Sequence, residues 1–460
     1  MKALATKTKN VNMLEGSLFF NLLKFALPLV LTGILQRLYH AADIVVVGRY
    51  AGADALAAVG ASGSLTTLIL DLFTGLSIGV SVVLGRALGA KNKEDAQKTV
   101  HTAMLISVFG GILISVFGIV FAAPLLRMIE VPADIMAQAK LYMQIVFAGK
   151  VPVLIYTFGS AIVRAKGDTK RPLYIITISG IINVVLNLFF VIVCKMRAEG
   201  VAVATVISQI FTAVAILYVL ISDEDETKLS FKKLRIHKTQ LLEIMRIGLP
   251  AGIQSSIFSV SNVIVQANVN AFGSVVLAGN TASANIGGFY YIMFHSLQQS
   301  ALAFVSQNIG AKNYDRIGKI LKNSFALVGI FEVIICLVSF TLGENLLKIY
   351  IPDDAAALAV GIKRLYLVGC CYGFNGLMSV MIGVLRGMGY SVSTMVMNII
   401  GSCAIRILWI FTAFEAVKKL EVLYLSYPIS WISAFIGLII LYFFAKRKLD
   451  KNAESAPPVA

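Results

Sequence analysis

Long apolar runs recur along almost the whole chain and limit its fold more than any other feature. About twelve of them approach or exceed the roughly 18 residues that a helix needs to span a bilayer. They begin near residues 18, 56, 99, 137, 172, 200, 242, 276, 320, 358, 392 and 422. An outer-membrane barrel would instead show segments of about 10 alternating residues. With 58% hydrophobic and 14% charged residues, the chain lacks the polar exterior of a soluble domain. The sequence therefore predicts an all-α integral membrane protein.

The formal net charge of +16 lies mostly in short clusters between the apolar runs. Membrane topology explains such clusters better than a nucleic-acid partner does. By the positive-inside rule, the basic loops and both termini are cytoplasmic, in a multi-pass protein of the cell membrane. Because no clear small-residue cleavage site follows the basic N-terminus, we expect the first span to be retained. The basic loops occupy 89–98, 164–171, 231–238 and 310–319, and a basic tail occupies 446–451.

The two halves of the chain repeat each other. "LGAK" at 88–91 recurs as "IGAK" at 309–312, and "RAKG" at 164 recurs as "RGMG" at 386, at a near-constant offset of 221 or 222 residues. Each copy holds about six spans, and an even number makes the copies parallel, with a pseudo-twofold axis along the membrane normal. We therefore expect two six-helix bundles around a central cleft. The predicted domains are an N-terminal bundle at 1–221, a cytoplasmic linker at 222–241, a C-terminal bundle at 242–445 and a cytoplasmic tail at 446–460.

Several short motifs carry a family resemblance when taken in order. They are "LPLVLTGILQRLYHAADIVVVGRYAGADALAAVG", then "GRALGAKNKEDA", "RAKGDTKRP" and "INVVLNLFF". This series resembles the multidrug and toxic compound extrusion (MATE) transporters of the bacterial type, and the resemblance covers nearly the whole chain. It implies a secondary antiporter that exports amphipathic, often cationic, small molecules in exchange for H⁺ or Na⁺. It also implies that the first span bends, and Pro28 on that span removes a backbone hydrogen bond.

The resemblance also implies a cation-coupling site in the N-terminal bundle. Its residues here are Asp43 on the first span, Asn183 and Asn187 on the fifth, and Thr205 on the sixth. Some family members carry Asp at the Asn187 position, so this site has one carboxylate fewer. Other members use acidic residues on the seventh and tenth spans, which this chain lacks within the apolar parts of those spans, so we expect no cation site in the C-terminal bundle.

Depth along the helices supports the same grouping without the family. At 1.5 Å per residue, Asp43 lies about 9 Å below Arg49, Asn187 about 12 Å below Lys195, and Thr205 about 9 Å below Glu199. One carboxylate, two amides and a hydroxyl then share one level of the membrane, and such oxygens suit Na⁺ or a protonatable acid. The alternatives are that Asp43 merely caps a helix end or meets water at the headgroups, and that the amides only join helices.

Other polar residues lie inside the spans. Asp71 is near mid-bilayer and is a second candidate for coupling or substrate contact, with Gln36 on the first span and His295 on the eighth. A lone histidine is more often a hydrogen-bonded interior residue than a proton relay. In the second half, Glu332 and Arg406 are the mid-span charges, and we expect them to form a structural ion pair.

The sequence argues against enzymatic chemistry and bound cofactors. The five cysteines show no CxxC spacing, so we expect no metal site apart from a coupling Na⁺ at Asp43, Asn183, Asn187 and Thr205. No Walker or Rossmann motif follows a strand, which excludes an ATP-driven pump without a separate subunit. A flippase of lipid-linked precursors is the alternative function, although it should line its cleft with several basic residues. A membrane transferase ranks last. The expected partners are amphipathic substrates and the lipid bilayer, with the protein acting as a monomer.

Overall fold

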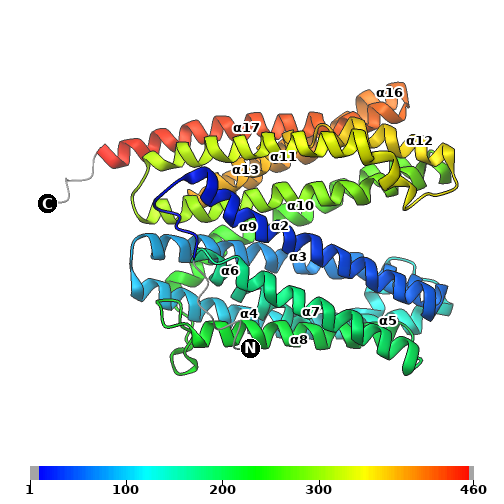
Figure 1. The fold of residues 1–460 in the computed structure, drawn as a ribbon, viewed down its shortest axis with the longest axis horizontal. Helices are drawn as coiled ribbons and strands as arrows, with labels where there is room; N and C mark the ends of the chain where they lie inside the picture. Colours follow the sequence, from blue (N-terminus) through cyan, green and yellow to red (C-terminus); the bar gives the residue numbers. More distant parts are fainter. Residues whose placement is uncertain (1–9, 455–460) are drawn as a thin grey trace. The chain divides into compact units, whose positions relative to one another are not determined.

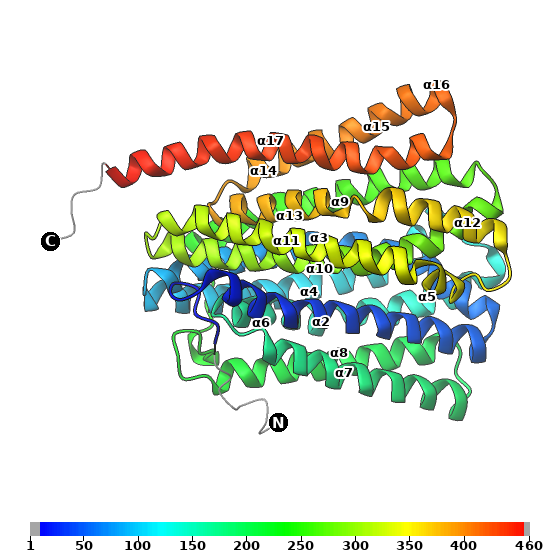
Figure 2. The ribbon, with the colours of Figure 1, turned by 45° about the horizontal axis from the view of Figure 1, so that its top comes forward.

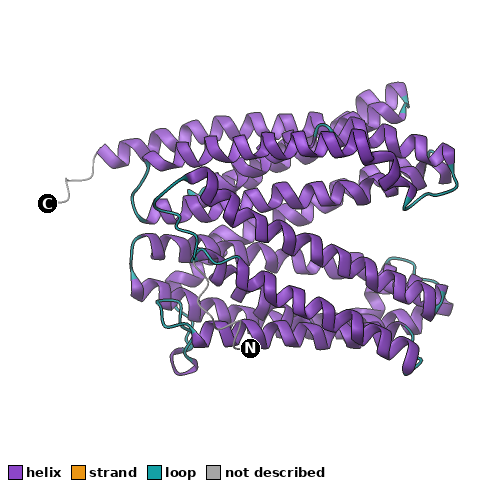
Figure 3. Cartoon of the chain, in the orientation of Figure 1, coloured by secondary structure: helices purple, strands orange, loops and turns teal. Residues whose placement is uncertain are grey.

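The structure is a computed structural model that describes residues 10–454, without the side chains of 53–54, 61–65, 67–68 and 452–454. Helices account for nearly all of this part of the chain, and no strand occurs in it (Figure 3). The helices of the first half are α2 (Leu18–Val46), α3 (Ala53–Gly89), α4 (Lys93–Met128), α5 (Ala133–Ala148), α6 (Lys150–Ala165), α7 (Lys170–Leu188) and α8 (Ala198–Ser222). Those of the second half are α9 (Lys238–Asn270), α10 (Ser274–Gly310), α11 (Asp315–Lys348), α12 (Ala355–Arg364), α13 (Tyr372–Gly387), α14 (Ser391–Asn398), α15 (Ile405–Trp409), α16 (Glu415–Val417) and α17 (Leu420–Glu454).

Short π-helical turns continue several of these helices. They are η1 (Val47–Ala51) after α2, η2 (Phe189–Val193) after α7, η4 (Leu365–Gly369) after α12, η5 (Ile399–Ala404) after α14 and η6 (Ile410–Phe414) after α15. A single 3₁₀ turn, η3 (Phe231–Lys233), lies in the segment that joins the two halves.

The predicted spans are confirmed in type and order. Within residues 10–454, nine helices are long and apolar enough to cross a membrane, and two further bent pairs qualify when each pair counts as one span. The 37-residue α10 supplies the remaining segment, although its Gln, Asn, His and Ser residues make it more polar. Several helices begin a few residues before the predicted starts near 56, 99 and 320 because their first turns are polar.

The fourth and tenth spans differ from the prediction, because neither is a continuous helix. The pair α5 and α6 and the pair formed by α12–η4 and α13 are each bent by 42°. Pro152 lies in the first turn of α6, where its missing N–H has no helical partner to lose. Pro152 cannot donate to the carbonyl oxygen of Ala148 four residues earlier, and its ring clashes with that carbonyl, so the helix breaks between them, at Gly149.

Backbone conformation repeats between the two halves. Gly52 and Gly273 both have φ of 92°, a left-handed value that L residues rarely adopt, at the start of α3 and α10. Lys91 and Lys312 follow α3 and α10 with φ of 54° and 58°. These matched turns have the same offset as the sequence motifs, so the repeat extends to the backbone.

Contacts divide the chain into two units. The first contains Pro28–Gly252 and the second contains Asn12–Leu27 with the residues from Ile253 onward. The joining segment and the first half of α9 therefore belong to the first unit. The chain passes between units after Val11, inside α2 at Pro28, and inside α9 two residues after Pro250.

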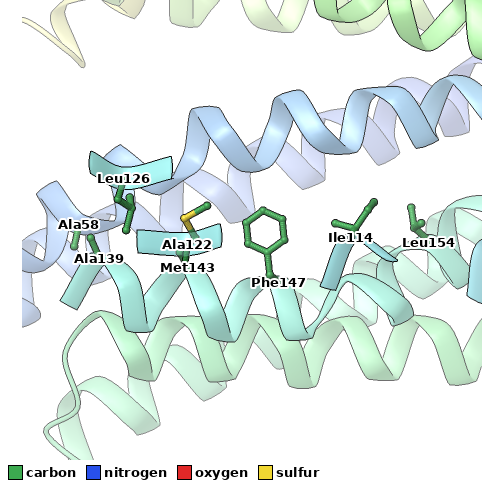
Figure 4. Close-up of a cluster of buried hydrophobic side chains, with 8 residues drawn as sticks. All are labelled: Ala58, Ile114, Ala122, Leu126, Ala139, Met143, Phe147 and Leu154. Carbon is green, nitrogen blue, oxygen red and sulfur yellow. The ribbon is translucent and has the colours of Figure 1, made fainter. Parts of the chain in front are cut away.

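Within the first unit, α4 packs against α5 and α6, and α7 lies beside α8 (Figures 1 and 2). Eight apolar side chains from α3 to α6 form a buried cluster there, drawn in Figure 4. The Phe147 ring in this cluster fills the space beside Gly118, where a Cβ would lie 2.0 Å from the ring.

Two glycines of α3 allow a close approach of two helix backbones in the first unit. A Cβ on Gly75 would lie 2.2 Å from the backbone nitrogen of Gly252, and one on Gly79 would lie 2.4 Å from the carbonyl oxygen of Ile244. Both contacts are with α9, so α3 and the first half of α9 touch backbone to backbone. These glycines serve close helix packing.

Within the second unit, α10 packs against α11, α12 and α13, and α17 packs against α13 and α14. In Figure 2 the ribbons of α10, α11 and α13 run close together. This unit encloses the second half's buried arginines.

Candidate functional site

Helices α2 and α7 meet through the side chain of Tyr39. Its ring lies against Gly180, where a Cβ would be 1.8 Å from the ring, and its hydroxyl donates to the carbonyl oxygen of Thr177 at 3.2 Å. The hydroxyl of Ser179 on α7 donates to the carbonyl oxygen of Ser208 on α8 at 3.0 Å. These contacts fix α7 between α2 and α8.

The four predicted cation-coupling residues lie on one continuous chain of hydrogen bonds. The amide nitrogen of Asn187 donates to a carboxylate oxygen of Asp43 and, at 3.2 Å, to the amide oxygen of Asn183. The amide nitrogen of Asn183 then faces the hydroxyl oxygen of Thr205 at 3.4 Å. Asn187 is fully buried and Asn183 nearly so. The structure therefore brings these residues together, as depth along the helices predicted.

A small cavity of about 110 Å³ opens beside this chain of hydrogen bonds. A pocket for a drug-sized molecule usually has 300 to 1,000 Å³, whereas one water needs only about 10–15 Å³. The cavity therefore suits an ion or a few waters rather than a drug-sized substrate. Its lining is Gln36, Tyr39, His40, Asp43, Ile176, Ser179, Gly180, Asn183, Thr205, Ser208 and Gln209.

An apolar layer lies one turn beyond Asp43 along α2. Val46 and Val47 pack there with Ala55, Val191 and Val201 in a buried cluster. This layer covers the polar site on the side of the α2–α3 and α7–α8 connections. By the predicted topology that side is the outer one.

Sequence reasoning found Gln36 but missed Tyr39 and His40, which also line the cavity. A signal for both was present. They precede Asp43 by four and three residues, which places them on the same face of a helix.

Asp71 and His295 lie elsewhere. Asp71, half-buried on α3, does not line this cavity, and no hydrogen bond or ion pair joins its side chain to another described residue. His295 belongs to α10 in the second unit, where it stacks on the Tyr291 ring with a centroid distance of 5.5 Å.

The site offers oxygen ligands to a cation. Besides the Asp43 carboxylate and the Thr205 hydroxyl, the amide oxygen of Asn187 is buried and accepts no hydrogen bond. Such a set fits Na⁺, which prefers hard oxygen ligands. Across residues 10–454, no group of three or more His, Cys, Asp or Glu side chains is arranged to hold a metal ion.

The predicted pair of Glu332 and Arg406 is wrong. Arg406 is fully buried, but its Nη1 donates to the Asn262 amide oxygen at 2.9 Å and its Nη2 to the Ser430 hydroxyl at 2.9 Å. Glu332 instead lies against Gly373, and no ion pair joins it to any residue that the structure describes. The pair fails because neutral side chains and aromatic rings, rather than a carboxylate, surround Arg406.

The sequence also gave no warning about Arg364. It lies at the end of α12, where a basic residue would normally extend to the headgroups, yet only 7% of its surface is exposed. A basic side chain that is buried within a span and does not reach water is costly. Such a residue therefore needs a reason to be there.

Polar contacts also fasten the segment after α8 to the first unit. The carboxylate of Asp223 pairs with Lys166 and, at 2.7 Å, with Nη1 of Arg171, and Arg171 also pairs with Asp168. Asp225 adds a second carboxylate on Lys166 at 2.9 Å. Burial acts to raise the pKa of Asp225, but hydrogen bonds from Thr227 and Lys166 outweigh it and hold that pKa below its usual value.

Further along, backbone N–H groups of this segment donate to α4. The acceptors are His101 Nε2, 3.2 Å from the nitrogen of Ser230, and the Thr102 hydroxyl, 3.0 Å from the nitrogen of His237. The segment is thus held along much of its length rather than loose.

Comparison with known proteins identifies the family. The MatE family model matches residues 28–189 and, a second time, residues 250–412. The chain belongs to the MATE family. The two matches also confirm the internal repeat. The protein is a multi-pass membrane transporter of this family and not an enzyme.

Relatives and solved structures agree with this assignment. The chain is 25% identical over 435 residues to the probable multidrug resistance protein YoeA of Bacillus subtilis, covering 92% of this chain and 93% of that protein. It is 24% identical over 442 residues to the probable multidrug resistance protein NorM of Thermotoga maritima, covering 94% and 93%. A crystal structure described as MATE in the bent conformation superposes with a TM-score of 0.90, 18% identity, and coverage of 98% and 100%. This last likeness supports the fold, which in this family has twelve transmembrane helices.

Proposed function

We propose that the protein is a secondary antiporter that exports amphipathic, mainly cationic, small molecules in exchange for H⁺, or for Na⁺ at the same site, by alternating access. One observation carries the proposal. The Asp43 carboxylate accepts a hydrogen bond from the buried Asn187 amide at the edge of a cavity of about 110 Å³. A carboxylate inside a membrane span is costly and usually marks an ion pathway.

The hydrogen bonds around Asn187 suggest how protonation changes the site. A charged Asp43 accepts from the Asn187 amide nitrogen, whereas a protonated Asp43 becomes a donor and needs an acceptor. The amide oxygen of Asn187 has no hydrogen bond, and rotating the amide by 180° would present it to Asp43. That rotation would break the bond from Asn187 to Asn183. Protonation of Asp43 would therefore rearrange the contacts between α2 and α7.

Sodium would use the same rearrangement. A Na⁺ ion near Asp43 would attract the amide oxygens of Asn187 and Asn183 and the hydroxyl of Thr205, and no second carboxylate lines the cavity. With one negative charge, the site would take one H⁺ or one Na⁺ per cycle. Exporting a monovalent cation 100-fold uphill against 100 mV requires about 5 kcal/mol, and exchange for one H⁺ cancels the electrical part.

The nature of the cargo and the sidedness rest on other observations. YoeA and NorM are named as multidrug resistance proteins, which supports xenobiotic cargo here. The basic loops support a cytoplasmic location for both termini, with the apolar layer above Asp43 toward the outside. The protein would work as a monomer without a cofactor.

Dye efflux from vesicles with imposed pH or Na⁺ gradients tests the proposal. We expect Asp43→Asn to abolish gradient-driven efflux, because the neutral amide can neither take up nor release the coupling ion. Asp71→Asn is the matched control, since Asp71 is also a carboxylate within a span but does not line the cavity. Full efflux by Asp43→Asn together with loss by Asp71→Asn would move the coupling to α3. The ion that drives wild-type efflux decides between H⁺ and Na⁺.

A further inference from the structure

The second unit buries two arginines beside one aromatic ring. The guanidinium carbon of Arg364 lies 5.7 Å from the centroid of the Tyr427 ring, and that of Arg406 lies 4.7 Å from the same centroid. Arg364 also lies over Tyr424, at 5.8 Å. Trp431 packs against Tyr427 with a centroid distance of 5.9 Å. We call these five residues the donor cluster.

The donor cluster lies inside the spans of the second unit. Arg406 is about 17 Å along its helix from Val417 at helical rise, and the hydrocarbon core of a bilayer is about 30 Å thick, so this side chain starts near its middle. Arg364 lies nearer one end of the spans, over Tyr424, which is one turn into α17. Two like charges buried inside the spans repel each other more strongly than they would in water.

No carboxylate within 4 Å neutralises either arginine among the residues that the structure describes. The nine ion pairs found there involve neither Arg364 nor Arg406. Lys363, next to Arg364, does have an acidic partner, Glu421, but this pair is exposed. Glu332, a mid-span acid of the same unit, lies against Gly373 and pairs with neither arginine.

The cluster also has more hydrogen-bond donors than acceptors. Arg364 has five N–H groups, of which one donates to the Ser283 hydroxyl at 3.3 Å, and its Nε is buried with no acceptor. The indole nitrogen of Trp431 and the hydroxyl of Tyr424 are likewise buried without a hydrogen bond. An acceptor that carries negative charge would satisfy these donors and neutralise the arginines together.

We propose that the donor cluster is a binding site for the anionic group of a flat aromatic solute. The guanidinium groups of Arg364 and Arg406 would hold a sulfonate, carboxylate or phosphate, with Tyr424 and Trp431 donating to it. The rings of Tyr427 and Trp431 would pack against the aromatic body, which a lipid phosphate on an aliphatic tail would not use. The site lies in the second unit, so it goes beyond the cation coupling proposed at Asp43. It extends the cargo from cations to anionic and zwitterionic aromatic compounds.

Fluorescence gives a direct test. The chain has two tryptophans, Trp409 and Trp431, so Trp409→Phe leaves a single reporter inside the cluster. The full-length variant in phosphatidylcholine nanodiscs is titrated with dansylate, an aromatic sulfonate, and with dansylamide, its neutral counterpart. Energy transfer from Trp431 reports binding. We expect dansylate to bind saturably and at least 10-fold more tightly than dansylamide, and the non-aromatic cyclohexanesulfonate to compete poorly.

Variants then assign the anion contact. In the same background, Arg364→Gln should weaken dansylate binding at least 10-fold, equal to about 1.4 kcal/mol, and leave dansylamide binding unchanged. Lys363→Gln is the matched control. It removes the same positive charge from the residue next to Arg364, which belongs to an exposed ion pair with Glu421. If Arg364→Gln does not fold, the comparison of dansylate with dansylamide in the parent protein still decides.

Three results would overturn the proposal. One is equal binding of dansylate and dansylamide, and another is unchanged dansylate binding in a folded Arg364→Gln protein. The third is loss of dansylate binding in nanodiscs that contain phosphatidylglycerol, because the cluster would then belong to lipid headgroups. None of these outcomes depends on gradient-driven efflux, so the coupling role of Asp43 is tested separately.

Discussion

The ion pairs that anchor the segment after α8 allow a quantitative prediction. Two cations, Lys166 and Arg171, face three carboxylates, Asp168, Asp223 and Asp225. Replacing Arg171 with Gln leaves one cation against three carboxylates. Replacing Asp223 with Asn leaves two of each sign. We therefore expect Arg171→Gln to be the more destabilising change.

The magnitude follows from burial. The side chains of Arg171, Asp168 and Asp223 are 4%, 1% and 8% exposed, and removing one partner of a buried pair typically costs about 3–5 kcal/mol. We expect about 4 kcal/mol for Arg171→Gln. For Asp223→Asn we expect about 2 kcal/mol, since Lys166 keeps Asp225 and Arg171 keeps Asp168. A loss of 4 kcal/mol should lower the unfolding midpoint of a unit of this size by about 10 °C.

Circular dichroism of purified variants in detergent measures the midpoint, and limited trypsin digestion measures release of the segment. Digestion should become faster after Lys228 and Lys232 in Arg171→Gln. Lys170→Gln is the matched control, because Lys170 is the adjacent residue and is exposed. Equal shifts in Lys170→Gln and Arg171→Gln, or a larger loss in Asp223→Asn than in Arg171→Gln, would refute the charge argument.

Further predictions concern packing, the coupling site and pH. Gly75→Val should cost at least about 3 kcal/mol and abolish accumulation of folded protein, whereas Gly60→Ala, with open space around its Cα, should accumulate normally on size-exclusion chromatography. Thr205→Val should remove the acceptor of Asn183, worth about 1 kcal/mol, and shift the ion concentration for half-maximal efflux by about fivefold; an unchanged value would argue against a role for this hydroxyl. Because the pKa of Asp225 is depressed in the folded protein, its stabilising effect is complete above its unfolded pKa of about 3.9 and disappears as the pH falls through the folded pKa. The protection of the amides of the segment after α8 against hydrogen exchange, relative to the intrinsic rate at each pH, should therefore fall below about pH 4, and less so in Asp225→Asn.

The fold was predictable because hydropathy and repetition are properties of single segments. Apolar runs placed the helices, and the motif offset of 221 or 222 residues reappears in the matched turns at Gly52 and Gly273. The breaks at Gly149 and after η4 were not predicted, because a break within an apolar run changes neither its length nor its hydropathy.

The site was predictable to the extent that depth alone determines neighbours. Asp43, Asn187 and Thr205 lie at one level on three helices, and the structure joins them through hydrogen bonds. Depth fails where helix rotation decides the partner. Glu332 and Arg406 are both mid-span, but each faces a different set of side chains. Arg364 was overlooked for a related reason, since a basic residue near a helix end usually reaches water.

The passage of the chain between its two units inside helices has a mechanical consequence. Pro28 and Pro250 each omit one backbone hydrogen bond close to a crossing point, so the helices yield most easily there. The long connecting segment, pinned by ion pairs within one unit, is not the hinge. Because the helix between Pro28 and Asp43 is about four turns long, a bend of α2 at Pro28 would displace the Asp43 carboxylate. An ion that breaks the hydrogen bond from Asn187 to Asp43 would therefore act about four helical turns from the point at Pro28 where α2 bends most easily.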